Sequence, residues 1–266
     1  MLTRRTFSSL TAALVLSGSS IFAKSVRQEV PPYPGAADLK SGDLLWPKKP
    51  GAYVPYDAAP DRSREADRQQ WEKEKEEFLA NAGTKAPYMN AKDLDVLRNM
   101  TFGEFYRRYA TPEKPPSKPT PYSAEGPFYV GHTAIVLRDG AADPWIIEAI
   151  WGKGVVRSHY SDWIAGRPGE RVWHGRIREV SEERRTSMAK EASKYLGQPY
   201  DFWNFDLNSD IGFYCSKLVW LATYRSLNFA IDGNANPRRV FWFSPKQLLY
   251  TRRILILLDQ GSYTDA

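Results

Sequence analysis

The chain contains little cysteine and little histidine, with one cysteine and three histidines among its 266 residues. A single cysteine excludes an internal disulfide bond. The sequence also lacks any His-x-x-His or Cys-x-x-Cys pair, and no histidine has metal-ligand spacing with the cysteine. We therefore expect no metal site and no cofactor, which leaves the lone thiol as the main candidate for reactive chemistry.

The N-terminal region lacks acidic residues up to position 28, and its apolar run is too short to span a bilayer, which needs about 20 residues. Thr3-Arg4-Arg5-Thr6-Phe7 has the twin-arginine pattern, a mildly apolar run follows over Leu10–Leu16, and small residues lead to Ala23. This order predicts an export signal of the twin-arginine type over residues 1–23. We expect a periplasmic protein with one domain over residues 24–266 and no membrane span after signal removal.

The charged residues do not form one basic run. The formal charge is +6, but the arginine pairs are spread along the chain, and 14% of the residues are aromatic. The aromatic content argues against disorder, and export makes a nucleic-acid partner unexpected. We interpret the arginines as solvated faces that could be attracted to anionic lipid or cell-wall polymer. The oligomeric state stays open.

The first third of the chain changes character after a short predicted strand over Asp43–Trp46. Two helical patterns follow, a highly charged one over residues 61–82 and another over residues 91–110. Residues 111–121 then contain five prolines, which favour an extended connector. We interpret residues 47–127 as a helical and proline-rich insertion. It could be a structural cap or a lid over the site.

The remainder alternates between strand and helix signals. Strands are predicted over residues 128–138 and 144–150, which form a hairpin, and over 152–157, 171–178 and 254–258. Helices are predicted over residues 161–165 and 244–250, after the cap Ser181, and from Cys215 onward. Neighbouring strands joined by short turns favour an antiparallel sheet. The sequence therefore predicts an α+β fold.

Cys215 stands at the start of an apolar helix. Leu218, Val219, Ala222, Ser226 and Phe229 follow at the spacing of one helix face, and Asp210 and Gly212 precede it. A thiol in the first turn lies near the positive end of the helix dipole, which favours the nucleophilic thiolate. The alternative is that Cys215 is an inert, small core residue. A histidine base and a partner for that base would favour the catalytic interpretation.

His132 and Glu148 are the best candidates for those partners. His132 opens the first strand of the predicted hairpin, and Glu148 lies across from it on the returning strand, directly or diagonally. A carboxylate among Ile147, Ala149 and Ile150 needs a partner, and an imidazole would provide one. His159 lies in a polar loop and His174 in a strand. Both are interpreted as surface or packing residues.

Several motifs in this order carry a family resemblance. They are Gly42-Asp43-Leu44-Leu45, Gly131-His132-Thr133-Ala134-Ile135, Ile147-Glu148-Ala149, Leu196-Gly197-Gln198-Pro199-Tyr200-Asp201 and Tyr214-Cys215-Ser216-Lys217-Leu218-Val219. Together they resemble the permuted papain-like cysteine hydrolases of the YiiX/YebB kind, relatives of the NlpC-type cell-wall amidases. The resemblance covers residues 40–50 and 127–258.

This resemblance implies a circularly permuted papain-like fold of the NlpC type, with the antiparallel sheet packed on the cysteine-bearing helix. It also implies that Cys215 is the nucleophile, His132 the base and Glu148 the acid that orients it. Tyr200 and Asp201 match a loop beside the family's site. With Tyr214 they are expected to shape the site or contact substrate.

The expected activity is that of a cysteine hydrolase that cleaves an amide bond in cell-envelope material, such as a cell-wall stem peptide, through a thioester. An acyl-lipid hydrolase or acyltransferase is the first alternative, because Trp203, Phe205, Phe213 and Trp220 could accept an acyl chain or could equally form the core. A non-catalytic envelope binding protein is the second alternative.

Overall fold

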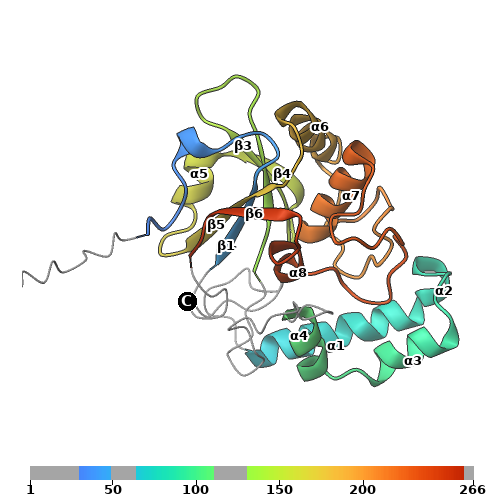
Figure 1. Ribbon diagram of the computed structural model, residues 1–266. Helices are drawn as coiled ribbons and strands as arrows, with labels where there is room; N and C mark the ends of the chain where they lie inside the picture. Colours follow the sequence, from blue (N-terminus) through green and yellow to red (C-terminus); the bar gives the residue numbers. More distant parts are fainter. Residues whose placement is uncertain (1–29, 49–63, 111–130, 261–266) are drawn as a thin grey trace, which may run out of the picture.

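The computed structural model describes residues 30–48, 64–110 and 131–260 (Figure 1). The predicted export signal over residues 1–23 and the proline-rich connector over residues 111–121 lie outside these ranges. The described elements are η1 (Ala36–Asp38), β1 (Leu44–Lys48), α1 (Arg64–Ala80), α2 (Ala82–Lys85), α3 (Ala91–Asn99), α4 (Phe102–Ala110), β2 (Ala134–Leu137), β3 (Trp145–Ile150), β4 (Gly154–His159), α5 (Tyr160–Ala165), β5 (Arg171–Ile177), α6 (Glu182–Ser193), α7 (Cys215–Leu227), α8 (Pro245–Leu249) and β6 (Ile254–Leu258).

The strands form one six-stranded antiparallel sheet in the order β4-β3-β2-β1-β5-β6. The predicted hairpin is present as β2 and β3, with Ile135 opposite Ile147. Its turn contains Gly140 at φ +97°, a left-handed conformation that glycine adopts readily. The mixed α/β architecture with an antiparallel sheet is thus confirmed.

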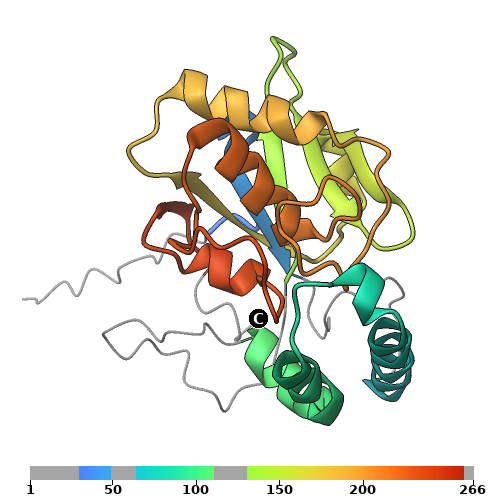
Figure 2. The ribbon, with the colours of Figure 1, turned by 90° about the vertical axis from the view of Figure 1, so that its right-hand side faces the viewer.

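The sheet is covered on both faces. Helices α6 and α7 pack against β2 and β3 on one face, and α5 packs against β3 and β4 on the other, as Figures 1 and 2 show. Alternate residues of each strand point to opposite faces, so Leu44 and Trp46 join the larger core while Leu45 joins the smaller one beside Tyr160 and Trp163. Each face therefore has its own apolar cluster.

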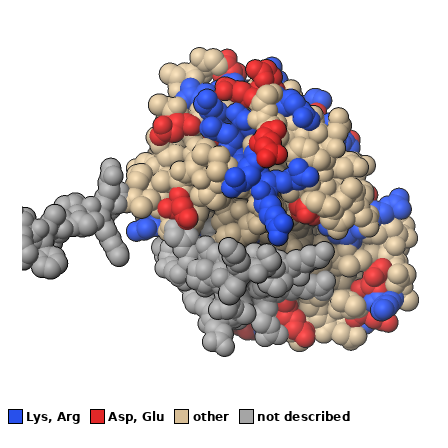
Figure 3. Space-filling view, in the orientation of Figure 1, with Lys and Arg blue, Asp and Glu red and all other residues tan. Residues whose placement is uncertain are grey.

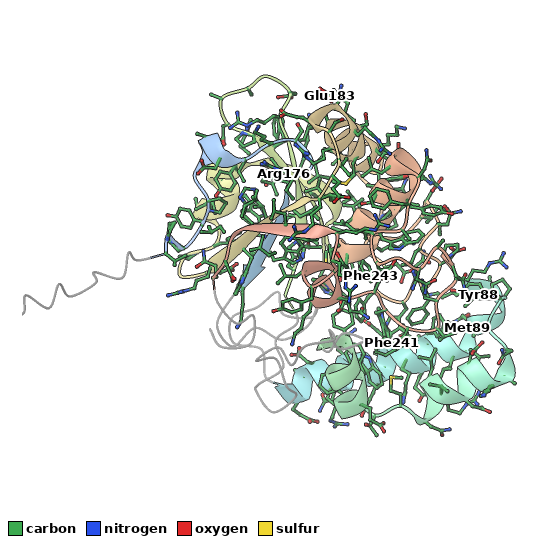
Figure 4. The ribbon with its side chains drawn as sticks, in the orientation of Figure 1. Tyr88, Met89, Arg176, Glu183, Phe241 and Phe243 are labelled. Atoms are coloured by element: carbon green, nitrogen blue, oxygen red, sulfur yellow. The ribbon has the colours of Figure 1, made fainter. Side chains whose placement is uncertain are left out.

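Helices α1 to α4 lie together at one end of the molecule (Figures 1 and 2). Their aromatic side chains pack into the main core. The Trp71 ring stacks on Phe105 at 5.2 Å, and Phe105 meets the edge of Trp242 at 4.8 Å. Figure 4 labels the two sequence neighbours of Trp242: Phe241 lies beside α4, and Phe243 lies nearer α8. Because this aromatic packing is continuous, helices α1 to α4 form one side of the main core.

The prediction of one helix over residues 91–110 was wrong, because α3 ends at Asn99 and α4 begins at Phe102. Thr101 caps the second helix: its hydroxyl accepts from the Glu104 N–H at 3.2 Å, and the Glu104 carboxylate accepts from the Thr101 N–H at 2.8 Å. This reciprocal arrangement is a capping box. The pattern Thr-x-x-Glu was visible in the sequence and marks the break.

Helix α7 begins at Cys215 as predicted, but its single apolar face was an incorrect prediction. Ten of its thirteen residues are buried, and Phe229 lies beyond its last residue. The helix ends at Leu227, and its C-cap Asn228 adopts a left-handed conformation with φ of 61°. A helix enclosed by the sheet, α6 and α8 has little solvent-facing surface, so periodicity understates its burial.

None of the helices in the described ranges is long and apolar enough to cross a membrane. On the face drawn in Figure 3, lysine and arginine side chains form a band over β6 with acidic groups among them. Arg252 and Arg253 are exposed just before this strand. The charged surface on this side is therefore mixed in sign.

Candidate active site

Pairing of two loop segments fixes the position of Cys215. The Phe213 N–H donates to the Pro199 carbonyl at 2.9 Å, and the Asp201 N–H donates to the Phe213 carbonyl at 3.1 Å. Tyr200 and Phe213 form a short parallel bridge. The loop that follows α6 therefore holds the two residues that lead into α7, and Cys215 is its first helical residue.

The first turn of α7 is clamped from the other side by Phe243. The Phe243 N–H donates to the Tyr214 hydroxyl at 3.2 Å, and the Ser216 hydroxyl donates to the Phe243 carbonyl at 2.5 Å. Tyr214 is the N-cap residue, but its side chain makes no capping bond. Among the described residues, the Cys215 N–H has no hydrogen-bond acceptor. That N–H is one of the free donors at a helix start.

His132 and Glu148 meet in the structure. His132 lies just before β2 and not inside it, which corrects the predicted strand start. Since Ile135 is opposite Ile147, Glu148 is diagonal to His132. The His132 Nε2 lies 2.7 Å from the Glu148 Oε2. Because the His132 Nε2 bonds Glu148, Nδ1 is the ring nitrogen that remains available to face Cys215.

Glu148 is a buried carboxylate with three donors on the same oxygen. Besides His132, the Trp163 indole N–H and an Arg167 N–H each donate to the Oε2 at 3.0 Å. Burial by itself would raise the pKa of Glu148, but the hydrogen bond and charge of His132, with the charge of Arg167, hold it below the ordinary value. Glu148 is therefore a carboxylate anion at neutral pH.

His132 interacts with both Glu148 and Cys215. Burial alone would lower the pKa of His132, but the charge of Cys215 and its hydrogen bond, followed by the hydrogen bond and charge of Glu148, raise it to about 9. The imidazolium form of His132 therefore persists through neutral pH. The His132 side chain is 27% exposed, so solvent and small molecules can reach it. Cys215, His132 and Glu148 form one chain of contacts.

Tyr200, Asp201 and Tyr214 have different surroundings. Tyr200 is partly buried, and burial with the nearby charge of Cys215 raises the pKa of its phenol well above the ordinary value, so it remains an O–H donor. The Asp201 carboxylate accepts from the Trp203 N–H at 3.0 Å in a local turn. Tyr214 is fully buried. The geometry thus gives Asp201 and Tyr214 bonds within the scaffold, and leaves Tyr200 within reach of the charge of Cys215.

Sequence reasoning missed the supporting groups of this site. Trp163 and Arg167 come from α5 and the turn after it, and no local pattern links them to Glu148. Lys217 was also missed: it is fully buried, and its Nζ donates to the Gly212 carbonyl at 2.8 Å. Burial lowers the pKa of Lys217 to about 7, although the negative charges of nearby aspartates act to raise it. A lysine among apolar residues in a helix could have signalled this burial.

The other two histidines lie elsewhere. His159 stacks on Trp145, with ring centroids 3.7 Å apart. His174 is buried, and its Nε2 lies 2.7 Å from the Asp43 carboxylate, which Arg176 also binds through two N–H groups at 2.6 and 2.7 Å. His174 is therefore a packing residue, as interpreted, with an ion-paired partner that the sequence did not predict.

Part of the chain matches a known protein family. Residues 121–234 match the family described as "Permuted papain-like amidase enzyme, YaeF/YiiX". The resemblance to the permuted papain-like family is confirmed. The matched segment contains Cys215, His132 and Glu148, so all three predicted catalytic residues lie inside the part of the chain that matches the family model.

The chain is also similar to a protein and to a solved structure from Escherichia coli. The protein YiiX of Escherichia coli, described as uncharacterized, is 33% identical over 118 residues, which is 43% of this chain and 55% of the relative. The chain thus matches about half the length of that relative. The crystal structure of an Escherichia coli protein described as metalloprotein YiiX has a TM-score of 0.45 and 18% identity, over 82% of this chain and 96% of the other. Within the described ranges of this chain, no three or more His, Cys, Asp or Glu side chains are grouped to hold a metal ion.

Proposed function

We propose that this protein is an exported cysteine amidase that hydrolyses amide bonds of cell-envelope peptides through Cys215, His132 and Glu148. One observation carries the proposal: His132 interacts with the Cys215 sulfur and bonds the Glu148 carboxylate at 2.7 Å. A thiol, an imidazole and a buried carboxylate in this order are the parts of a nucleophile, a base and an orienting group. The amidase description of the matched family agrees with the reaction class.

The first half-reaction forms a thioester. The Cys215 thiolate attacks the amide carbonyl carbon, and the carbonyl oxygen becomes an oxyanion to which the free Cys215 N–H donates a hydrogen bond. The His132 imidazolium then gives its proton to the amide nitrogen as the C–N bond breaks. The amine leaves, the acyl group remains on the Cys215 sulfur, and His132 is neutral.

The second half-reaction restores the enzyme. Neutral His132 takes a proton from a water molecule as the water oxygen attacks the thioester carbonyl carbon. The C–S bond breaks, the carboxylic acid leaves, and the thiolate and imidazolium form again. Glu148 remains an anion throughout, because it stabilises the imidazolium and holds the ring in one orientation.

The alternative of an acyl-lipid substrate loses the feature that favoured it. Trp203, Phe205, Phe213 and Trp220 are all buried in the main core, where they pack against other side chains. They supply no acyl-binding surface. A peptide or amino-acid amide of the envelope is therefore the preferred substrate class, and export through the predicted signal would bring the enzyme to it.

Trapping of the acyl-enzyme tests this proposal. The mature chain is incubated with a panel of peptide amides and, separately, acyl esters, and intact mass is followed with the Cys215→Ala variant as control. A peptide acyl adduct on Cys215 that decays to free acid supports an amidase. An adduct formed from acyl esters alone would assign the enzyme to lipids, and absence of any adduct would favour a binding protein.

A further inference from the structure

Glu148 is shared between the catalytic pair and a second cation. Its Oε2 accepts from His132 at 2.7 Å and from Arg167 at 3.0 Å. A guanidinium is a permanent cation, whereas the imidazole gains and loses a proton in the reaction. The Glu148 carboxylate therefore faces the permanent positive charge of Arg167 and a positive charge on His132 that is present only in the imidazolium form.

Arg167 is held rigidly in this position. Its guanidinium carbon lies 4.0 Å from the ring centroid of Trp163, and one N–H group donates to the Trp163 carbonyl at 3.0 Å. The Nε lies 3.7 Å from the Glu170 carboxylate. The Trp163 indole itself donates to the same Glu148 oxygen. A stacked, multiply bonded guanidinium is a preorganised partner that lysine cannot copy fully.

A buried carboxylate without a permanent cation would hold the imidazole proton too tightly. When His132 loses its proton, the anion beside it would be left in an apolar environment, and that cost opposes proton loss. A second cation stabilises the anion in both protonation states of the imidazole, and its charge also repels the imidazolium directly. Both effects favour release of the proton.

We propose that Arg167 is a positioning residue that keeps Glu148 ionised and oriented in both protonation states of His132, so that His132 can give up its proton in the first half-reaction and regain it in the second. The inference rests on the proposed function of Cys215 and His132. The groups that act on His132 are Cys215 from α7 and Glu148 from β3, with Arg167 beyond Glu148. The Tyr200 phenol interacts with the charge of Cys215 and remains protonated.

The protonation of His132 can be measured directly. The chain has three histidines, so ¹⁵N–¹H spectra of the imidazoles resolve into three titrations, assigned with variants of His159 and His174. The Arg167→Met variant keeps much of the side-chain volume and removes the charge. Its His132 midpoint should rise by about 1 pH unit, because a nearby cation is lost. Arg167→Lys should restore the midpoint toward that of the parent protein.

Two results would overturn the proposal. An unchanged His132 midpoint in Arg167→Met would mean that the guanidinium does not act on the pair. A midpoint that falls toward the ordinary histidine value would mean that Arg167 only supports the fold and that the pair separates without it.

Arg253→Met is the matched control, because it removes a guanidinium stacked 4.3 Å from the Phe229 ring and should leave the His132 midpoint unchanged. If Arg167→Met does not fold, Arg167→Gln carries the test, because it also removes the charge: its midpoint should rise as well, and an unchanged midpoint would refute the proposal.

The design separates failure of this inference from failure of the proposed function. The titration is repeated in the Cys215→Ser background, where no thiolate acts on His132, and it needs no substrate. A rise of the midpoint in both backgrounds supports the role of Arg167 even if no acyl-enzyme forms. An acyl-enzyme together with an unchanged midpoint would sustain the hydrolase and refute the role of Arg167.

Discussion

The molecule contains two histidine–carboxylate–arginine clusters with nearly the same local chemistry. In one, His132 lies 2.7 Å from Glu148, which also binds Arg167. In the other, His174 lies 2.7 Å from Asp43, which also binds Arg176. The His132 side chain is 27% exposed and lies beside the Cys215 thiol, whereas the His174 side chain is 3% exposed and joins β5 to the start of β1. Accessibility and a neighbouring nucleophile, not the ion pair itself, distinguish a candidate catalytic histidine from a structural one.

Removal of each histidine should have opposite consequences. We expect His132→Ala to lower amide hydrolysis at least about 10³-fold, because it removes the base, with little change in thermal unfolding. His174→Ala should instead lower the free energy of unfolding by about 3 kcal/mol, since Asp43 and Arg176 lose a buried partner. Hydrolysis rates per folded molecule and chemical denaturation measure the two effects. A catalytic loss in the folded His174→Ala protein would erase the distinction.

The carboxylates provide a second, smaller contrast. Glu148→Gln keeps the shape and removes the charge that stabilises the imidazolium, so the rate should fall on the order of 10²-fold to 10³-fold. Asp43→Asn should destabilise the fold by about 2 kcal/mol while the rate per folded molecule stays unchanged. Rates are measured with Cys215 titrated as the active fraction. Equal rate losses in the two variants would contradict separate roles.

The pH dependence of thiol labelling should reveal the charge of His132. Its raised pKa of about 9 keeps the imidazolium present below that pH, and the cation attracts the negatively charged reagent iodoacetate. The ratio of iodoacetate to iodoacetamide rates, which cancels the reactivity of the sulfur itself, should therefore fall as pH rises through about 9. Glu148→Gln should move this fall to lower pH. A ratio that stays flat between pH 7 and 10 in the parent protein would refute a charged His132 beside Cys215.

Lys217 extends the comparison to a buried cation bonded to a carbonyl instead of a carboxylate. Its pKa is lowered from the ordinary 10.5 to about 7, so between these values the unfolded chain binds more protons than the folded one. Stability due to this group should therefore rise with pH over that window, by up to about 1.4 kcal/mol per pH unit. The difference in unfolding free energy between the parent protein and Lys217→Met should follow this slope. Parallel curves for the two proteins would contradict it.

Local signals predicted most of the secondary structure. Ser181 and Ser244 cap α6 and α8, and the strong strand signals became the sheet. The capping box at Thr101 was equally local, and the prediction of one long helix failed because the apolar pattern was given more weight than the cap. The helical segment was left as cap or lid, and Phe105 and Tyr109 of this segment contact Trp242 in the main core.

The sequence by itself determined the candidate nucleophile and its helix, because one cysteine stands at one clear helix start. It also indicated His132 and Glu148, since a hairpin of two adjacent strands sets their register within a short stretch of chain. Only the tertiary structure decided which groups support them. Trp163 and Arg167 reach Glu148 from α5 and the turn after it, His174 contacts Asp43 131 residues away, and Lys217 bonds a carbonyl of the preceding loop. The physical reason is that burial and charge pairing arise between elements distant in sequence, and periodicity reports only which way a side chain faces within its own element.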